Sequence, residues 1–298
     1  MNSKHYHFYF LFLALFLFSG SSCAYRSGTG RNMEAVASEV ERTPSDSVEA
    51  LSDTIAGYGE RDSGIDIVER SRALEIPAPM KGTSERILKR TGFEESYNAV
   101  TRIPNWVAWH LTAAHTNGPI QRKDYDFTDD ESVPDPKEYD ADYHHSGWTH
   151  GHLCPAGDNK WSAQAMADCF LVTNMCPQAA GLNSGLWNTI EKWCREWAKA
   201  YGEVYIVCGP VFLQRKHQTI GENRVVVPEA FFKVVLCMKG TPKAIGFICR
   251  NRSAKGKKPA SFVNTVGEVE RITGINFFPS LPNRVMREVE NHCDLRQW

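Results

Sequence analysis

Four histidines stand close together in the segment HHSGWTHGHLCPAGDNKW, residues 144–161. Imidazole is a common metal ligand and also exchanges protons near neutral pH, so the cluster indicates either a metal site or acid–base chemistry. A structural zinc site is not favoured, because such sites usually contain closely spaced cysteine pairs and the sequence has no CxxC step. His144 and His145 follow a polar stretch and are predicted to be solvated or to pack. The chemistry is therefore expected in THGH, residues 149–152.

Oxygen-bearing side chains follow this step at regular distances. Asn174 precedes a Pro-Gln pair, Asn183 comes nine residues later, and Glu191 eight residues after that. Residues 185–202 have helical periodicity, which places Asn183 just before a helix and Glu191 about two turns inside it, on a similar face. An amide oxygen and a carboxylate suit a hard cation such as Mg²⁺. The pattern therefore predicts an oxygen-ligated cation site.

These residues, in this order, resemble the non-specific DNA/RNA endonucleases of the ββα-metal (His-Me finger) class, which includes secreted bacterial nucleases and mitochondrial endonuclease G. The family signature is Asp-Arg-Gly-His, then Asn-x-x-Pro-Gln, a second Asn, Trp and Glu. It corresponds here to THGH (149–152), NMCPQ (174–178), Asn183, Trp187 and Glu191. The resemblance covers nearly all of residues 85–285 and extends to the segments NWVAWHLT, VCGPVF, VVVPEAFFKVVL and RITGINFFPSLP.

The resemblance implies a role for each matching residue. His152 matches the general base that takes a proton from the attacking water, a task that suits a neutral imidazole. Asn183 matches the single direct protein ligand to Mg²⁺, which Mn²⁺ or another divalent cation could replace, and Glu191 matches a carboxylate that orients a water of the ion. Asn174 matches a residue that orders the base and its surroundings. Arg122 matches an arginine that contacts the phosphate, for which a planar, permanently charged group is well suited.

The sequence departs from the signature where Thr149-His150 replaces Asp-Arg, so the second phosphate-facing arginine is absent. His150 could donate a hydrogen bond to phosphate, and would add charge only when protonated. If His150 must be charged while His152 is neutral, activity should favour slightly acidic to neutral pH. A flat activity from about pH 6 to about pH 9 would argue against that coupling.

A basic segment, RNRSAKGKKPA, spans residues 250–260. Such a run is usually a solvated loop, but in a nuclease it could also follow a phosphate backbone. Residues 82–298 carry 26 Lys+Arg against 24 Asp+Glu, so affinity for nucleic acid should be modest and sensitive to salt. The basic residues that could bind substrate are Arg250, Arg252, Lys255, Lys257 and Lys258.

Local patterns predict the elements that position these residues. Strands are expected at 105–112, 169–177, 203–212, 224–238 and 244–250, and helices at 185–202 and 261–275, with Gly202 and Gly274 as stop signals. Strands and helices come in mixed order without strict alternation. We therefore predict an α+β fold with a largely antiparallel sheet and packed helices.

The N-terminus reads as an export signal at 1–22, with a positive start, an apolar run at 8–18 and small residues before Cys23. Cys23 is predicted to be lipidated, giving an exported periplasmic, cell-surface or secreted protein, with a membrane partner through the anchor if the lipid is present. Residues 23–81 are predicted to form a low-complexity tether, and 82–298 one domain. The eight remaining cysteines permit disulfides without specifying their pairing, and the oligomeric state is left open.

The leading hypothesis is a Mg²⁺-dependent endonuclease that acts on DNA and RNA with little sequence preference, since no base-reading module is apparent. Two alternatives stay open. One is a phosphodiesterase of the same fold that acts on another phosphate ester. The other is a surface nucleic-acid-binding protein that is catalytically weak because of the change at His150.

Overall fold

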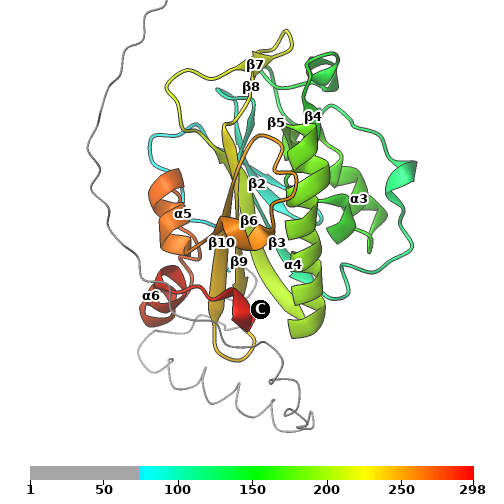
Figure 1. Cartoon of the computed structure of the whole chain (residues 1–298). Coiled ribbons are helices and arrows are strands. Elements are labelled where there is room, and N and C mark those ends of the chain that lie inside the picture. Colours follow the sequence, from blue (N-terminus) through cyan, green and yellow to red (C-terminus); the bar gives the residue numbers. More distant parts are fainter. Residues whose placement is uncertain (1–73) are drawn as a thin grey trace, which may run out of the picture. The chain divides into compact units, whose positions relative to one another are not determined.

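The computed structural model describes residues 74–298 (Figure 1). The predicted export signal, Cys23 and most of the predicted tether lie outside these residues. The described fold begins with a packed segment, in which Leu74 is buried and the Ala78 amide donates a hydrogen bond to the Asn276 carbonyl at 2.9 Å. Within residues 74–298, no helix has the length and apolar character needed to cross a membrane.

A seven-stranded sheet forms the centre of the fold, with strand order β1-β2-β3-β6-β9-β10-β11. Every pair of neighbouring strands in it is antiparallel. This confirms the predicted α+β class with a largely antiparallel sheet. The strands are β1 (Arg86–Lys89), β2 (Glu94–Asn98), β3 (Ile103–Thr112), β6 (Glu203–Val211), β9 (Ala230–Cys237), β10 (Lys243–Arg250) and β11 (Val263–Asn264).

The central strands are apolar on both faces because both faces are covered. All eight residues of β9, AFFKVVLC, are buried, and alternate side chains enter two separate cores. On β3, for example, Val107 and Trp109 belong to one core and Trp106 and Ala108 to the other. Period-two alternation in a sheet covered on both sides thus explains the nearly continuous apolar runs.

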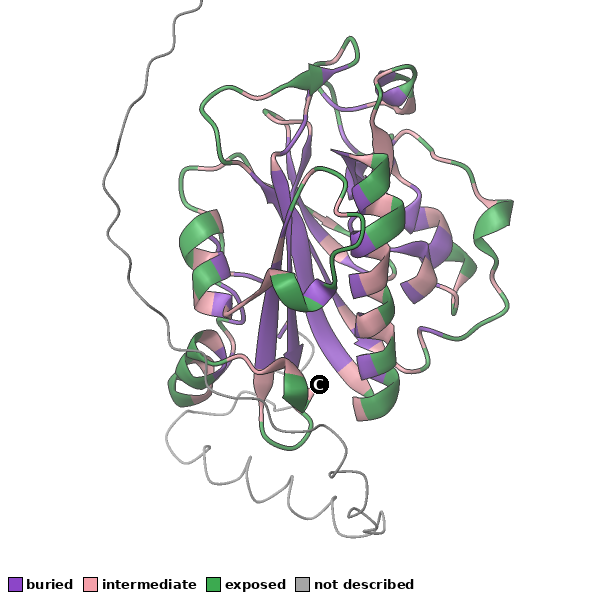
Figure 2. Ribbon diagram, in the orientation of Figure 1, coloured by how far each residue is buried: buried purple, intermediate pink, exposed green. Residues whose placement is uncertain are grey.

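Helices cover the two faces (Figures 1 and 2). Helices α3 (Ala163–Cys169) and α4 (Asn188–Tyr201) pack on one face, and α5 (Val266–Thr273) and α6 (Asn283–Asn291) on the other. Helix α4 buries Ile190, Cys194, Trp197 and Ala198, a single stripe at helical spacing. Gly202 has φ +89° and ends α4, as its sequence position predicts.

Two short two-stranded antiparallel sheets complete the fold: β4 (Thr149–His152) with β5 (Met175–Gln178), and β7 (Thr219–Ile220) with β8 (Val225–Val226). Strand β5 is followed, after residues 179–181, by the π-helical turn Leu182–Trp187 and then by α4. This succession of two strands and a helix matches the expected ββα arrangement.

Three elements differ in extent from their sequence predictions. The predicted strand at 169–177 is strand only from Met175, because Cys169 ends α3 and Val172–Asn174 form a 3-10 turn. The predicted helix at 261–275 begins only at Val266, because Thr265 and Glu268 form a capping box that starts it there. The predicted strand at 224–238 is divided into β8 and β9.

The eight cysteines of the described chain are all free thiols. Seven of them are buried in the domain and Cys293 is half-buried. Burial raises the pKa of Cys154, which stands two residues after the predicted base in sequence. A thiol in such surroundings is a weak nucleophile, so Cys154 is a packing residue rather than a catalytic one.

Candidate active site

The ββα unit gathers the predicted catalytic residues from three successive elements. His152 is the last residue of β4 and pairs in register with Met175 of β5. Asn183 lies in the π-helical turn, and Glu191 lies in the first turn of α4. A π-helical insertion of this kind is frequent at functional sites because it changes the direction in which side chains project.

His152 lies in an aromatic pocket. Its ring meets Phe170 edge-on at 5.1 Å between centroids and lies 5.5 Å from the Phe127 ring. Burial, reinforced by the positive charge of Arg122 and by coulombic interaction with His150, lowers the pKa of His152 to about 3. Its Nε2 atom has no hydrogen-bond partner within residues 74–298. His152 is therefore a neutral imidazole with an unengaged ring nitrogen, the state in which a histidine can accept a proton.

Arg122 lies beside His152 although the two are thirty residues apart in sequence. It begins the 3-10 turn Arg122–Asp124, and its guanidinium carbon lies 5.7 Å from the centroid of the Phe170 ring that also contacts His152. Its charge contributes to the lowered pKa of His152 and opposes the raised pKa of Glu191. The exposed guanidinium thus lies at the same site as His152, and its contact with phosphate stays a prediction.

The amide of Asn183 is held in one orientation. Its Nδ2 donates to the Thr149 hydroxyl at 3.0 Å and to the His150 carbonyl at 3.1 Å. The Thr149 hydroxyl itself donates to the Gln178 carbonyl at 2.8 Å, so it can only accept from Asn183. Both acceptors fix the amide nitrogen at this position, and Oδ1 has no hydrogen bond to any described residue. The geometry presents a carbonyl oxygen as a ready ligand for a hard cation.

Glu191 is half-buried on the helix that follows the Asn183 turn. Burial raises the pKa of Glu191 to about 7, and the charges of Lys233, Arg195 and Arg122 oppose that rise. No hydrogen bond from another described residue occupies its carboxylate. The carboxylate is therefore available for a polar ligand.

Two basic side chains near Glu191, Lys233 and Arg195, were not selected from the sequence. Lys233 of β9 is fully buried, with Nζ at 4.7 Å from the Trp109 ring centre and 4.8 Å from that of Trp187. Arg195 donates to Asp158 at 2.8 Å, and the Trp109 indole donates to the same carboxylate at 3.1 Å. The signal for Lys233 was available, since one lysine interrupts the apolar run AFFKVVLC.

These donors fit Mg²⁺ better than zinc. Residues 74–298 contain no group of three His, Cys, Asp or Glu side chains that could hold a metal ion. An amide oxygen with a nearby carboxylate leaves most of the coordination to water, and Mg²⁺ typically keeps several waters. Zinc would require several nitrogen or sulfur ligands, which this site lacks.

Asn174 is fully buried behind His152. Its Oδ1 accepts from the Cys154 amide, and its Nδ2 donates to the carbonyls of Cys154 and Cys169, each at 2.9 Å. The Asn174 carbonyl also accepts from the Leu153 amide at 3.0 Å. All polar atoms of this side chain are thus engaged with backbone, so Asn174 holds the chain that follows His152.

His150 lies on the same face of β4 as His152, between two aromatic rings. The ring centroids of Phe127 and Tyr143 are 4.0 Å and 3.9 Å from that of His150, nearly parallel to it. Its Nε2 is 2.9 Å from Asp140 Oδ1, close enough for an ion pair but outside hydrogen-bond angles. Burial lowers the pKa of His150, and Asp140 partly opposes this. Stacking between the two aromatic rings fixes the orientation of the His150 ring, and contact of His150 with phosphate stays a prediction.

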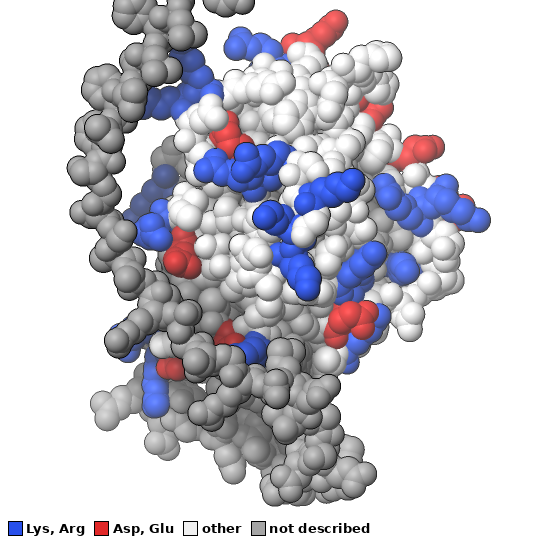
Figure 3. Space-filling view, viewed as in Figure 1, with Lys and Arg blue, Asp and Glu red and all other residues white. Residues whose placement is uncertain are grey.

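The basic loop after β10 packs beside the turn that carries Asn183. Asn251 accepts from the Ala179 amide at 2.8 Å and donates to the Pro177 carbonyl at 3.0 Å, and Ser253 lies against Gly181. Figure 3 shows Lys and Arg side chains gathered across this face, over the loop and α4. No ion pair engages the loop cations among the described residues, which are Arg250, Arg252, Lys255, Lys257 and Lys258.

Comparison with known proteins agrees with this geometry. The profile of the DNA/RNA non-specific endonuclease family matches residues 72–284. Human mitochondrial nuclease EXOG is 34% identical over 243 residues, covering 76% of this chain and 65% of EXOG. Human mitochondrial endonuclease G is 32% identical over 209 residues (66% and 70%), and nuclease C1 of Cunninghamella echinulata 34% over 215 residues (67% and 85%). The chain thus spans just under two thirds of the length of EXOG.

A solved structure has the same fold. The crystal structure of the EndoG/EndoGI complex, which concerns the mechanism of EndoG inhibition, superposes with a TM-score of 0.67 at 26% identity. The match covers 75% of this chain and 96% of the solved one.

The relatives overturn one prediction from the sequence. Export to a periplasm, cell surface or medium was expected, yet the relatives include mitochondrial nucleases from human, mouse and Schizosaccharomyces pombe. The prediction of an exported protein is therefore wrong. An apolar segment after a positive charge is a weak signal, because it specifies no destination by itself.

Proposed function

Because the chain belongs to the DNA/RNA non-specific endonuclease family, we propose that it hydrolyses phosphodiester bonds of DNA and RNA in the presence of Mg²⁺. The observation that carries the proposal is that two atoms able to accept a proton or a cation have no hydrogen bond to any described residue. One is Nε2 of the neutral His152 and the other is Oδ1 of Asn183. A proton acceptor beside a cation ligand is what hydrolysis of a phosphodiester requires.

His152 would take the proton of the attacking water at its free ring nitrogen. A pKa of about 3 in the absence of substrate keeps the imidazole neutral at working pH. A bound phosphate would offset the charge of Arg122 and favour the imidazolium, so the pKa of His152 should rise when it must act. Base strength would thus increase with substrate in place.

The remaining residues would bind and orient. Arg122 would contact a non-bridging phosphate oxygen, and Asn183 would hold the ion through Oδ1 with Glu191 accepting hydrogen bonds from its waters. When bound, such an ion would supply positive charge to stabilise the phosphate and the leaving 3′ oxygen. Asn174 would act at a distance by fixing the backbone after His152.

Cleavage of plasmid DNA and of RNA by the purified full chain, with Mg²⁺ or with EDTA, tests the proposal. The expected result is degradation of both substrates that stops with EDTA and leaves 5′-phosphate ends, since the 3′ oxygen departs. Intact nucleic acid with Mg²⁺ would overturn it, and retained binding would then favour a catalytically weak nucleic-acid-binding protein. Turnover of other phosphate diesters without cleavage of nucleic acid would favour a different phosphodiesterase.

A further inference from the structure

A pocket of about 490 Å³ is lined by Trp148, which directly precedes β4, and by the first residues of the basic loop after β10. Its size falls within the range of about 300–1,000 Å³ typical of small-molecule sites. Aromatic, amide and guanidinium side chains line it, among them Trp148, Gln214, Gln218, Arg250 and Arg252. None of the catalytic roles proposed above uses Trp148 or either glutamine.

Two residues that line the pocket lead to Asn183, the proposed ligand of the cation. Trp148 directly precedes Thr149, whose hydroxyl accepts from the Asn183 amide at 3.0 Å. On the other wall, Asn251 accepts from the Ala179 amide, and the Ala179 carbonyl accepts from the Asn183 backbone amide at 3.0 Å. Two residues that line the pocket, Trp148 and Asn251, are therefore linked to the segment that carries Asn183, the proposed ligand of the cation.

The lining groups match the parts of a nucleotide. Trp148 is half-buried, its amide donates to the Ser146 hydroxyl at 3.1 Å, and its indole nitrogen has no hydrogen bond to any residue that the structure describes. The Trp148 side chain packs against the buried core and is partly exposed, and an aromatic ring so placed suits base stacking, which accepts any base. Gln214 and Gln218 are exposed amides that can both donate and accept.

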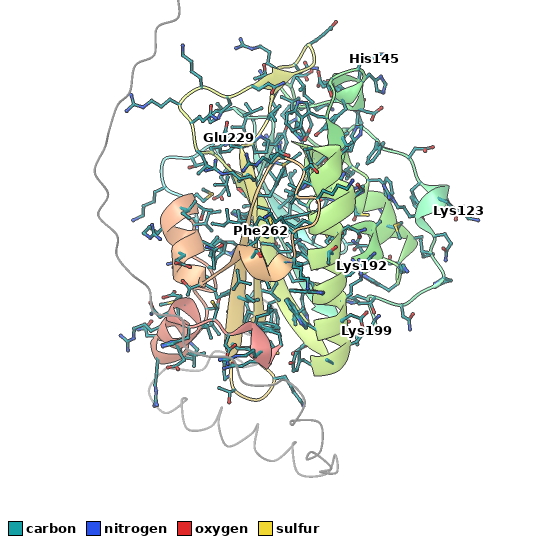
Figure 4. All side chains as sticks on the ribbon, viewed as in Figure 1. Lys123, His145, Lys192, Lys199, Glu229 and Phe262 are labelled. Carbon is teal, nitrogen blue, oxygen red and sulfur yellow. The ribbon has the colours of Figure 1, made fainter. Side chains whose placement is uncertain are left out.

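The electrostatics of the pocket suit a phosphate. Arg250 and Arg252 are exposed, and neither has an acidic partner within the described part of the chain. Glu229, labelled in Figure 4, is the one acidic residue among those that line the pocket. Its two carboxylate oxygens are already engaged, accepting from the Leu213 amide and paired with His217, each at 2.8 Å. Repulsion of an incoming anion is reduced accordingly.

We propose that this pocket is a subsite for one nucleotide of the substrate strand, with its base stacked on Trp148 and its phosphate beside Arg250 and Arg252. The inference rests on the proposed function and adds to it a contact with the base. A subsite of this kind would accept different bases, because stacking and adaptable amides do not distinguish strongly among them.

The test compares binding of a short single-stranded oligonucleotide with binding of an abasic strand of the same length, in EDTA so that no cleavage occurs. Wild-type protein should prefer the strand with bases about tenfold, and Trp148→Ala should remove most of that preference. Trp148→Phe should keep most of it, since a phenyl ring still stacks. Trp161→Ala is the matched control, an exposed tryptophan outside this pocket that should leave the preference unchanged.

A second variant guards against a folding defect in Trp148→Ala. Gln214→Ala combined with Gln218→Ala changes two exposed side chains and should reduce the preference severalfold. An unchanged preference in the glutamine variant and in any folded Trp148→Ala protein would overturn the subsite. Addition of Mg²⁺ to the same preparations separates the two claims, because absence of cleavage by wild type would refute the proposed function alone.

Discussion

The variant Asn174→Ala tests whether Asn174 contacts substrate or positions His152, the proposed base. Asn174→Ala removes three hydrogen bonds of 2.9 Å each. Each is worth about 1 kcal/mol net, and the buried backbone groups left without partners add about 1–3 kcal/mol more in total. The expected loss in the free energy of unfolding is therefore about 4–6 kcal/mol, a large part of the roughly 5–15 kcal/mol available to a domain.

Urea unfolding of the metal-free protein measures this loss. Asn291→Ala is the control, because Asn291 is exposed on α6 and donates only to the Arg287 carbonyl, and it should change stability by less than about 0.5 kcal/mol. At a temperature where Asn174→Ala is folded, kcat should fall about a hundredfold with KM nearly constant, since His152 is displaced while phosphate contacts remain. A loss of under about 1 kcal/mol together with abolished kcat would refute the reasoning and indicate direct contact with substrate.

Three further predictions concern buried charge and the basic loop. Burial raises the pKa of Glu138, so its contribution to stability is present below the unfolded pKa of 4.5 and is lost as the pH rises. Glu138→Gln should therefore reduce the fall in unfolding free energy between about pH 5 and about pH 8, by at most about 1.4 kcal/mol per pH unit. An unchanged dependence on pH in urea unfolding would contradict this. Lys233→Met should raise the pKa of Glu191 above about 7 in the metal-free protein, measured by NMR of labelled glutamate carboxyls, and a lowered pKa would contradict it. The double variant Lys257→Ala, Lys258→Ala should bind single-stranded DNA with a weaker dependence on salt. The slope of log binding constant against log salt concentration should decrease by about 0.7 for each phosphate that is no longer neutralised. An unchanged slope would show that these lysines do not contact the DNA.

The sequence was most informative where chemistry depends on residue type and order. His152, Asn183, Glu191 and Arg122 were selected from spacing and resemblance, and the fold brings them to one site. The strand containing residues 105–112 was also predicted, because apolar alternation there is strong.

Features that depend on contacts between residues far apart in sequence could not be predicted from local sequence patterns. The strand predicted at 169–177 reaches only from Met175, since the polar atoms of Asn174 bond to backbone on either side and favour a turn over a ladder. Asn251 positions the Asn183 turn across more than sixty residues, and nothing in its neighbourhood marks it. The start of α5 is different, because the capping-box spacing of Thr265 and Glu268 is a local signal that the sequence itself contains.

The role of His152 is tested most directly by the rate of phosphodiester cleavage at saturating Mg²⁺ and substrate. His152→Ala should lower kcat at least about a hundredfold without weakening substrate binding, whereas His144→Ala, an exposed histidine of the same segment, should leave kcat unchanged. Equal rates for wild type and a folded His152→Ala protein would contradict the account, because the attacking water would then lose its proton without the imidazole of His152.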